Sequence, residues 1–145
     1  MIRRLHHVGI VTSDIELAAR HYVASFGVPE PKIVSIDRPG VKLRSAMISV
    51  GGGTHVQLIE PAIGLGVEEL RSRGEGAIIE LAFEVDDIES FSQQKRAEGA
   101  TLTDLAGNPI EADYLVAASG NRYVYLAKDG NLGTSFELIE VRNKP

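Results

Sequence analysis

The sequence predicts an α+β domain built from two βαβββ modules whose strands form a cupped mixed sheet. The first observation behind this prediction is a repeat. Residues 5–16 and 79–89 each run from a polar residue through an apolar strand to Asp-Ile-Glu, with a shift of 73 positions (80 minus 7). Residues 56–60 and 136–140 also match, with a shift of 80 (136 minus 56). The composition agrees, because 43% hydrophobic residues in a chain of 145 suffice for one shared core.

The first module is predicted over about residues 1–61. In chain order its elements are a strand at 4–11, a helix capped by Ser13 or Asp14, a loop at 30–40 that holds a short strand at 32–36, and strands at 41–50 and 54–60. Gly27 ends the helix, the glycines at 51–53 supply the positive φ of a hairpin turn, and Pro61 ends the last strand. The buried face of the helix is predicted to carry Leu17, Ala18, His21, Tyr22 and Ser25.

Residues 62–76 are predicted to be a linker with a short helix at 67–73, and the second module follows over about 77–145. Its elements are a strand at 78–85, a helix at 87–98 with Ile88, Phe91 and Ala97 facing inward, a loop at 100–118 with one or two short strands, a strand at 122–127, a turn at 128–131 and a closing strand at 134–141. Residues 1–145 are therefore expected to form a single domain of two modules.

The composition excludes several classes of partner and of chemistry. A net charge of −5 and the lack of a Lys/Arg run interleaved with aromatics argue against nucleic acid as a partner. No apolar run reaches the roughly 20 residues of a membrane span, and the N-terminus does not resemble a signal peptide, so we expect a cytoplasmic protein with a small-molecule substrate. The absence of cysteine excludes disulfides and thiolate chemistry, so any metal must be held by His, Asp, Glu, Gln or backbone oxygen.

Four polar side chains occupy repeat-related positions: His7 and Glu80 on the first strands of the modules, Gln57 and Glu137 on the last. Their neighbours in sequence are apolar, so strand alternation turns all four away from the face that the helices cover. If the two sheets curl towards each other, the four converge, and a divalent cation would relieve the burial of two carboxylates. The mixture of N and O donors leaves Mn, Fe(II), Co, Ni and Zn open.

A single His or Gln on a strand is more often a surface or hydrogen-bonded residue than a ligand. Four such residues at equivalent positions favour a shared site instead. The remaining histidines are predicted to lie outside it. His6 points to the helix-covered face, His55 lies close to a turn, and His21 packs on the first helix.

Residues 7–11, 56–61, 73–76, 81–88 and 133–140 carry a family resemblance that covers nearly the whole chain. They resemble the vicinal oxygen chelate superfamily, which includes glyoxalase I, bleomycin resistance proteins and dioxygenases. The likeness is strongest for the methylmalonyl-CoA epimerase group, which has a similar Gly-Glu-Gly linker and a similar ending of the last strand. The resemblance implies a glyoxalase-like fold, with metal ligands from the first and last strands of each module.

By resemblance, His7, Gln57 and Glu137 match the first, second and fourth ligands of the epimerases. The third is a histidine in that group, and Glu80 stands here; a gapless alignment from the linker would place Ile79 there instead. One His is too few for the two-His, one-carboxylate iron site of the oxygen-activating members. The extra negative charge of Glu80 is expected to weaken the Lewis acidity of the metal, so that proton abstraction depends more on the base.

The resemblance leaves the base open. A metal-bound glutamate acts as base in glyoxalase I, and Glu137 or Glu80 would correspond to it here. The epimerases use a separate glutamate after the first helix, for which Asp37 is the nearest carboxylate in this chain.

The implied function is that of a metal-dependent epimerase or isomerase. It would abstract a proton α to a carbonyl, in an acyl-CoA or a 2-oxo or 2-hydroxy acid, through a metal-stabilised enolate. The alternatives are a glyoxalase I-like lyase and a metal-free small-molecule binding protein of the antibiotic-resistance type. A homodimer is expected by resemblance.

Overall fold

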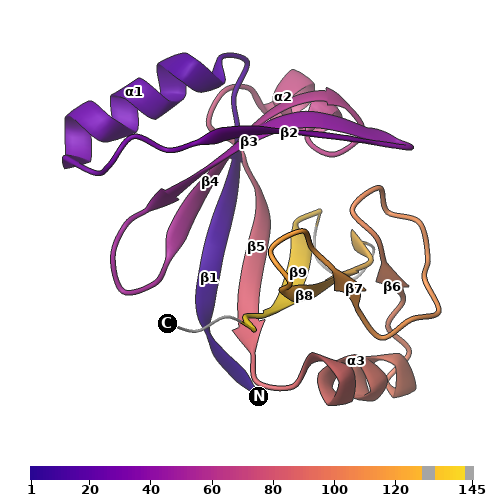
Figure 1. The fold of residues 1–145 in the computed structure, drawn as a ribbon. Coiled ribbons are helices and arrows are strands. Elements are labelled where there is room, and N and C mark those ends of the chain that lie inside the picture. The colour runs from indigo at the N-terminus through magenta and orange to yellow at the C-terminus, as the bar shows by residue number, and fades with distance from the viewer. Residues whose placement is uncertain (129–132, 143–145) are drawn as a thin grey trace. The chain divides into compact units, whose positions relative to one another are not determined.

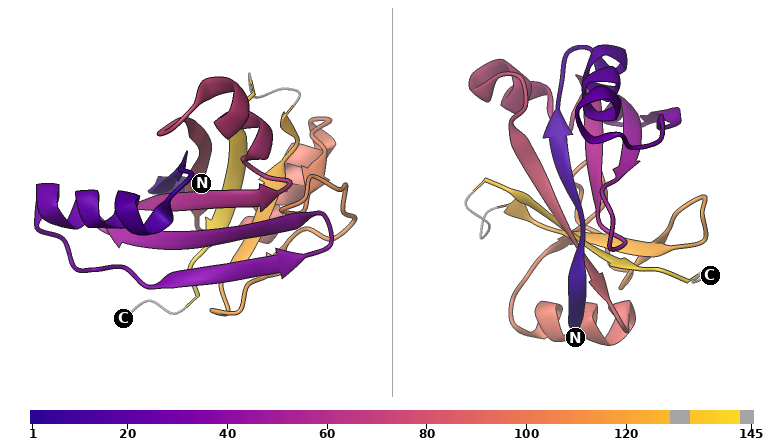
Figure 2. Two further views of the ribbon diagram at one scale, coloured as in Figure 1. Left: turned by 90° about the horizontal axis from the view of Figure 1, so that it is seen from above. Right: turned by 90° about the vertical axis from the view of Figure 1, so that its left-hand side faces the viewer.

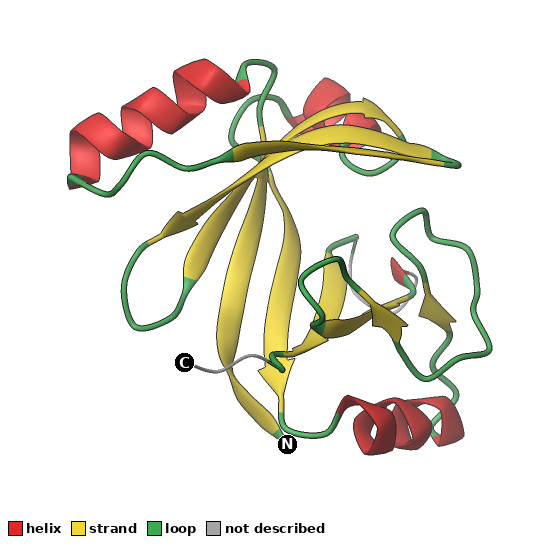
Figure 3. Ribbon diagram, viewed as in Figure 1, coloured by secondary structure: helices red, strands yellow, loops and turns green. Residues whose placement is uncertain are grey.

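The computed structural model describes residues 1–128 and 133–142. Its helices are α1 (Ile15–Phe26), α2 (Val67–Arg73) and α3 (Ile88–Ala97). The strands are β1 (Ile2–Val11), β2 (Ile33–Arg38), β3 (Val41–Ser49), β4 (His55–Ile63), β5 (Ile78–Val85), β6 (Leu102–Thr103), β7 (Leu115–Val116), β8 (Arg122–Leu126) and β9 (Ser135–Glu140). The predicted α+β class with mixed β-sheet is confirmed, as Figures 1 and 3 show.

The chain divides into two compact units, one of residues His7–Ile79 and one of Met1–His6 with Glu80–Pro145. We call them the first and the second unit. Strand β1 contributes to both, since its residues up to His6 belong to the second unit and those from His7 to the first.

In the first unit the strand order is β2-β3-β4-β1, with β1 parallel to β4 and the other pairs antiparallel. This is the predicted βαβββ arrangement, and β2, β3 and β4 lie side by side in the left view of Figure 2. Helix α1 packs on the sheet through a core in which Ile15 and Ala19 meet Ala46, Ile48 and Leu58. Burial of these apolar side chains holds the helix on the sheet.

The second unit repeats the plan with the order β5-β9-β8-β6, in which β5 is parallel to β9 and β7 also pairs with β8. Its core gathers Val85 from β5, Ile88 from α3 and Leu138 from β9, together with Leu102 and Val124. The strands β6 and β7 are only two residues each, which agrees with the predicted loop with one or two short strands.

The repeat holds at the level of strand register. In the first unit Gly9 of β1 lies opposite Gln57 of β4, and in the second unit Ala82 of β5 lies opposite Glu137 of β9. These pairs are related by the same shifts of 73 and 80 positions that the sequence shows (82 minus 9 and 137 minus 57). The polar residues aligned in sequence therefore occupy equivalent places in the two sheets.

Helices α1 and α3 begin in the same way. The side chains of Asp14 and Asp87 cap α1 and α3 by accepting hydrogen bonds from the backbone N–H groups of Leu17 and Ser90. A glutamate at the end of the last strand adds a second cap in each unit. Glu60 accepts from the N–H of Ile15 at 2.9 Å and Glu140 from that of Ile88 at 3.0 Å.

These caps explain why the predicted helix faces were partly wrong. The N–H of Ile15, the first residue of α1, donates a hydrogen bond to Glu60 of β4, which holds Ile15 against the sheet. The buried positions of the helix are therefore Ile15 and Ala19. Leu17, His21 and Ser25 are exposed, contrary to prediction, whereas Ala18 and Tyr22 are partly buried as predicted. In α3, Ile88 is buried and Phe91 partly so, but Ala97 is exposed and Ser92 is buried instead.

Pro61 does not end its strand, because β4 continues to Ile63. The ladder with β3 shifts register between Lys42 and Leu43, and Pro61 lies opposite Leu43 at that irregularity. A register shift is a place where a strand tolerates a residue that has no N–H to donate. The predicted hairpin glycines at 51–53 all have positive φ, as expected.

The predicted turn at 128–131 lies outside the described residues, apart from Lys128. In the part of the chain that the structure describes, no helix combines the length and the hydropathy needed to span a bilayer.

Candidate metal centre

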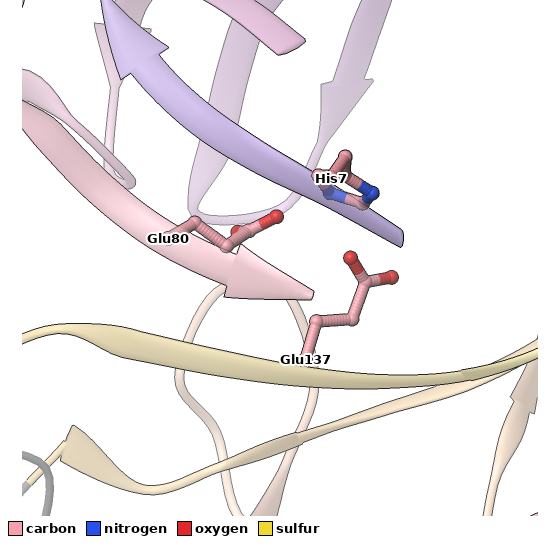
Figure 4. Close-up of side chains that lie close together, drawn as sticks. All are labelled: His7, Glu80 and Glu137. Carbon is pink, nitrogen blue, oxygen red and sulfur yellow. The ribbon is translucent and has the colours of Figure 1, made fainter. Parts of the chain in front are cut away.

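His7, Glu80 and Glu137 lie close together, as Figure 4 shows. One potential ligand atom from each of them lies within 4.8 Å of those of the other two. All three are buried, with 4%, 1% and 7% of their surface exposed. Three of the four predicted metal ligands are therefore brought together.

Strand register explains why Glu80 and Glu137 share a face. Glu137 lies opposite Ala82, and Ala82 is two residues after Glu80, so the side chains of Glu80, Ala82 and Glu137 project from the same side of the second unit's sheet. Ala82 is fully buried and has only a methyl group. Its small size leaves room for the longer carboxylates beside it.

Gln57, the fourth predicted ligand, shares a face with His7 in the first unit. It lies opposite Gly9, and Gly9 is two residues after His7. Its Nε2 donates a hydrogen bond to Ser45 Oγ at 3.0 Å. Its Oε1 is buried and accepts no hydrogen bond from the described residues. A buried acceptor without a donor costs about 1–3 kcal/mol, which a cation at that oxygen would offset.

Electrostatics also favour a cation. Two carboxylate oxygens within 4.8 Å of each other repel by about 3 kcal/mol or more at an effective dielectric constant of about 20. A proton on His7 would balance one of the two charges, whereas a divalent ion would balance both. Ligand atoms about 2.1 Å from an ion lie roughly 3–4 Å apart, so the observed separation suits a metal after small side-chain movements.

Other buried carboxylates of the chain are balanced by cationic side chains. Glu84, which follows Glu80 on β5, forms an ion pair with Arg4 at 2.6 Å. Burial tends to raise the pKa of Glu140, but the N–H of Ile88 and the guanidinium of Arg142 outweigh it, and the pKa is lowered overall. Glu84 and Glu140 therefore have structural roles.

Arg44 links the first unit's cap to the start of α1. Its guanidinium binds Glu60 on β4 and Glu16 on α1, and this pairing raises the pKa of Arg44 above its usual range. Hydrogen bonding to Arg44 in turn lowers the pKa of Glu16.

The remaining candidates are not part of the His7, Glu80 and Glu137 group. Asp37 is on β2 rather than in a loop, has 74% of its side chain exposed, and lies 3.9 Å from Lys42 Nζ. His55 lies opposite His7 on the neighbouring strand, and His21 is exposed on α1. Ser45, the hydrogen-bond partner of Gln57, was not identified from sequence.

Comparison with known proteins agrees with the fold. A profile of the Glyoxalase/Bleomycin resistance protein/Dioxygenase superfamily matches residues 6–125. The methylmalonyl-CoA epimerase of Mycobacterium tuberculosis is 25% identical, with a TM-score of 0.77 over 98% of this chain and 90% of that one. A Streptomyces coelicolor methylmalonyl-CoA epimerase variant in complex with 2-nitronate-propionyl-CoA is 22% identical, with a TM-score of 0.75 over 99% and 100% of the two chains. No protein of curated function matches significantly.

The fold and the buried His/Glu cluster thus define an α+β protein with paired βαβββ motifs and a potential metal centre. The chain belongs to the Glyoxalase/Bleomycin resistance protein/Dioxygenase superfamily. Among the solved structures similar to it are methylmalonyl-CoA epimerases.

Proposed function

We propose that this chain is an epimerase or isomerase that removes a proton from the carbon α to a carbonyl, in an acyl-CoA or a related 2-oxo or 2-hydroxy acid. The observation that carries the proposal is the approach of two buried carboxylates, Glu80 and Glu137, to His7 within 4.8 Å. Superfamily membership and the likeness to the M. tuberculosis epimerase support it.

The proposed ligands of a divalent metal are His7, Gln57, Glu80 and Glu137. The orphaned Oε1 of Gln57 and the mutual repulsion of the two glutamates both fit such an ion. Nitrogen and oxygen donors together suit Mn, Fe(II), Co, Ni or Zn. When bound, the ion supplies Lewis-acid polarisation of the substrate carbonyl.

The chain itself supplies the base. We assign proton removal to Glu137 or Glu80, whose carboxylate oxygens are acceptors in a water-poor setting. The α C–H bond breaks, the proton moves to a carboxylate oxygen, and the electron pair moves towards the carbonyl oxygen. Inversion follows when a proton returns to the other face of that carbon. The second glutamate would deliver this proton, and for that it must be protonated when the substrate binds, while the first glutamate is ionised.

Asp37 is the less favoured base in this proposal. A general base works best where water is excluded, and Asp37 is largely exposed and close to Lys42. A homodimer remains part of the proposal on the strength of the family resemblance. A cytoplasmic location and a single domain of two modules remain part of it as expectations from the sequence.

The proposal is tested by deuterium uptake from heavy water into the α position of methylmalonyl-CoA and other acyl-CoAs. We expect exchange with protein reconstituted with Mn²⁺ or Co²⁺, a loss of at least about 100-fold on adding EDTA, and a similar loss in Glu137→Gln. Lack of exchange in metal-loaded protein would contradict the proposal. Consumption of a thiol hemithioacetal would then indicate a lyase, and failure to bind any ion would indicate a metal-free binding protein.

A further inference from the structure

Gln57 differs from the other three proposed ligands in one chemical respect. The two ends of its side-chain amide have nearly the same shape, but only the oxygen can coordinate a cation, because the NH₂ group is a pure donor. A glutamate such as Glu137 has two equivalent oxygens, so either of them can face the cation. The site therefore requires something that fixes which end of the Gln57 amide is presented.

Ser45 holds the nitrogen end of that amide in this structure. It is on β3, buried with 3% of its surface exposed, and its Oγ accepts the hydrogen bond from Gln57 Nε2 at 3.0 Å. In the ladder between β3 and β4, Ser45 lies opposite Ile59, two residues after Gln57, so Ser45 and Gln57 project from the same face. With the nitrogen directed to Ser45, Oε1 points away from it, and Oε1 is the buried oxygen that accepts no bond from the described residues.

The second unit provides an internal comparison. The position equivalent to Ser45 is Tyr123, which lies opposite Ile139 as Ser45 lies opposite Ile59. Both units thus carry a hydroxyl residue at this position, a small serine where the proposed ligand is an amide and a larger tyrosine where it is a carboxylate.

We infer that Ser45 is a positioning residue that holds the Gln57 amide with Oε1 directed to a divalent cation. This inference rests on the proposed function. Ser45 acts through Gln57 and does not itself coordinate the ion. All of its contacts used here lie within the first unit.

The test measures binding of Mn²⁺ and Co²⁺ by titration calorimetry, which does not depend on turnover. Ser45→Ala should weaken affinity about 10- to 100-fold, the usual effect of losing a residue that orients a metal ligand. Ser92→Ala is the matched control, since Ser92 is fully buried on α3 and its Oγ makes no hydrogen bond with the described residues. That variant should bind both ions as the wild type does.

A double-mutant cycle makes the test specific to amide orientation. Gln57→Glu makes the two ends of the side chain equivalent, so Ser45→Ala can no longer change which end is presented, and it should weaken affinity less in that background than in the Gln57 background. A purely structural role of Ser45 predicts the same loss in both backgrounds and would overturn the inference. Unfolding of each metal-free variant in urea checks that it is folded, and Ser45→Cys, whose sulfur is a weak acceptor, replaces the alanine variant if that one fails to fold.

The outcomes separate the two proposals. If the wild type binds neither ion, both the proposed function and the Ser45 inference are overturned. If the wild type binds and Ser45→Ala binds equally well, only the role of Ser45 is overturned.

Discussion

Glu80 and Glu84 show that one strand can carry two buried carboxylates with different roles. They lie four residues apart on β5, on the same face by strand alternation, and are exposed by only 1% and 4%. Arg4 balances Glu84 through an ion pair at 2.6 Å. In our proposal a metal ion balances Glu80. The family resemblance predicts a histidine at this ligand position, and a glutamate there adds a negative charge, which should strengthen binding of hard cations and weaken their Lewis acidity.

Neutralising Glu80 should therefore affect metal binding much more than neutralising Glu84. Glu80→Gln is expected to weaken Mn²⁺ affinity by at least about 10-fold, because it removes an anionic ligand. Glu84→Gln should change that affinity by less than about threefold, yet should lower the free energy of unfolding, because the ion pair between Glu84 and Arg4 is lost. Calorimetry and urea denaturation of both variants check this, and equal affinities would show that Glu80 is not a ligand.

At the scale of elements, the N-termini of α1 and α3 are fastened by the same two contacts. An aspartate cap satisfies an N–H of the first turn, and a glutamate from the end of the last strand binds the first helical N–H. Glu60 and Glu140 follow Gln57 and Glu137 by three residues. The strand that carries a proposed ligand thereby also fixes the helix that covers the opposite face of its sheet.

The end of β4 meets the β2–β3 turn at two glycines. Gly64 has a φ of +79°, and a Cβ at that position would lie 2.1 Å from the carbonyl oxygen of Gly40. Gly64→Ala should therefore combine the penalty of a left-handed residue with a backbone clash. We expect it to lower the free energy of unfolding by at least about 3 kcal/mol.

Gly52 offers a matched control in the β3–β4 hairpin. Its φ is +61°, but a Cβ there would contact nothing within 4 Å. Gly52→Ala should cost only about 1 kcal/mol. Urea denaturation of the two variants measures the difference, and equal losses would mean that the approach of Gly64 to Gly40 is unimportant.

For the whole molecule, several carboxylates are held in their charged form. A hydrogen bond from Ser13 lowers the pKa of Glu75, which anchors the Gly-Glu-Gly linker, and bonds from Ser90 lower that of Asp87. The pKa values of Glu16 and Glu98 are lowered by hydrogen bonds from Arg44 and Lys95. These groups are spread over both units.

Stability should consequently fall in acid. A carboxylate whose pKa is lower in the folded state stabilises the fold above its unfolded pKa, which is 4.5 for Glu, and loses that contribution as the pH falls through the folded pKa. In EDTA, the free energy of unfolding should stay nearly constant between about pH 7 and 5 and decrease below about 4.5. Glu75→Gln should lessen this decrease, whereas Glu30→Gln at an exposed position should not. A curve for Glu75→Gln that matches the wild type would contradict this role of Glu75.

Much of the architecture was predictable because its signals are local. The bounds of α2 and β5 match their predicted ranges. Gly27 at the end of α1 and the hairpin glycines were identified from residue type and spacing, and Asp14, the N-cap, was one of the two candidates with Ser13. The repeat was equally accessible. It placed His7, Gln57, Glu80 and Glu137 at equivalent strand positions without any knowledge of how the strands pair.

The partners of the buried polar side chains were decided by the tertiary structure, because they depend on strand register. Ser45 is twelve residues from Gln57 in sequence, and only the β3–β4 ladder makes it the partner of that amide. The inward turn of Ile15, the continuation of β4 through Pro61 and the pairing of Glu84 with Arg4 arise in the same way. The sequence by itself determined the repeated elements and the donor positions, because periodicity and capping act over a few residues. Which neighbour satisfies each buried polar atom depends on contacts between distant segments, and these exist only once the sheet has formed.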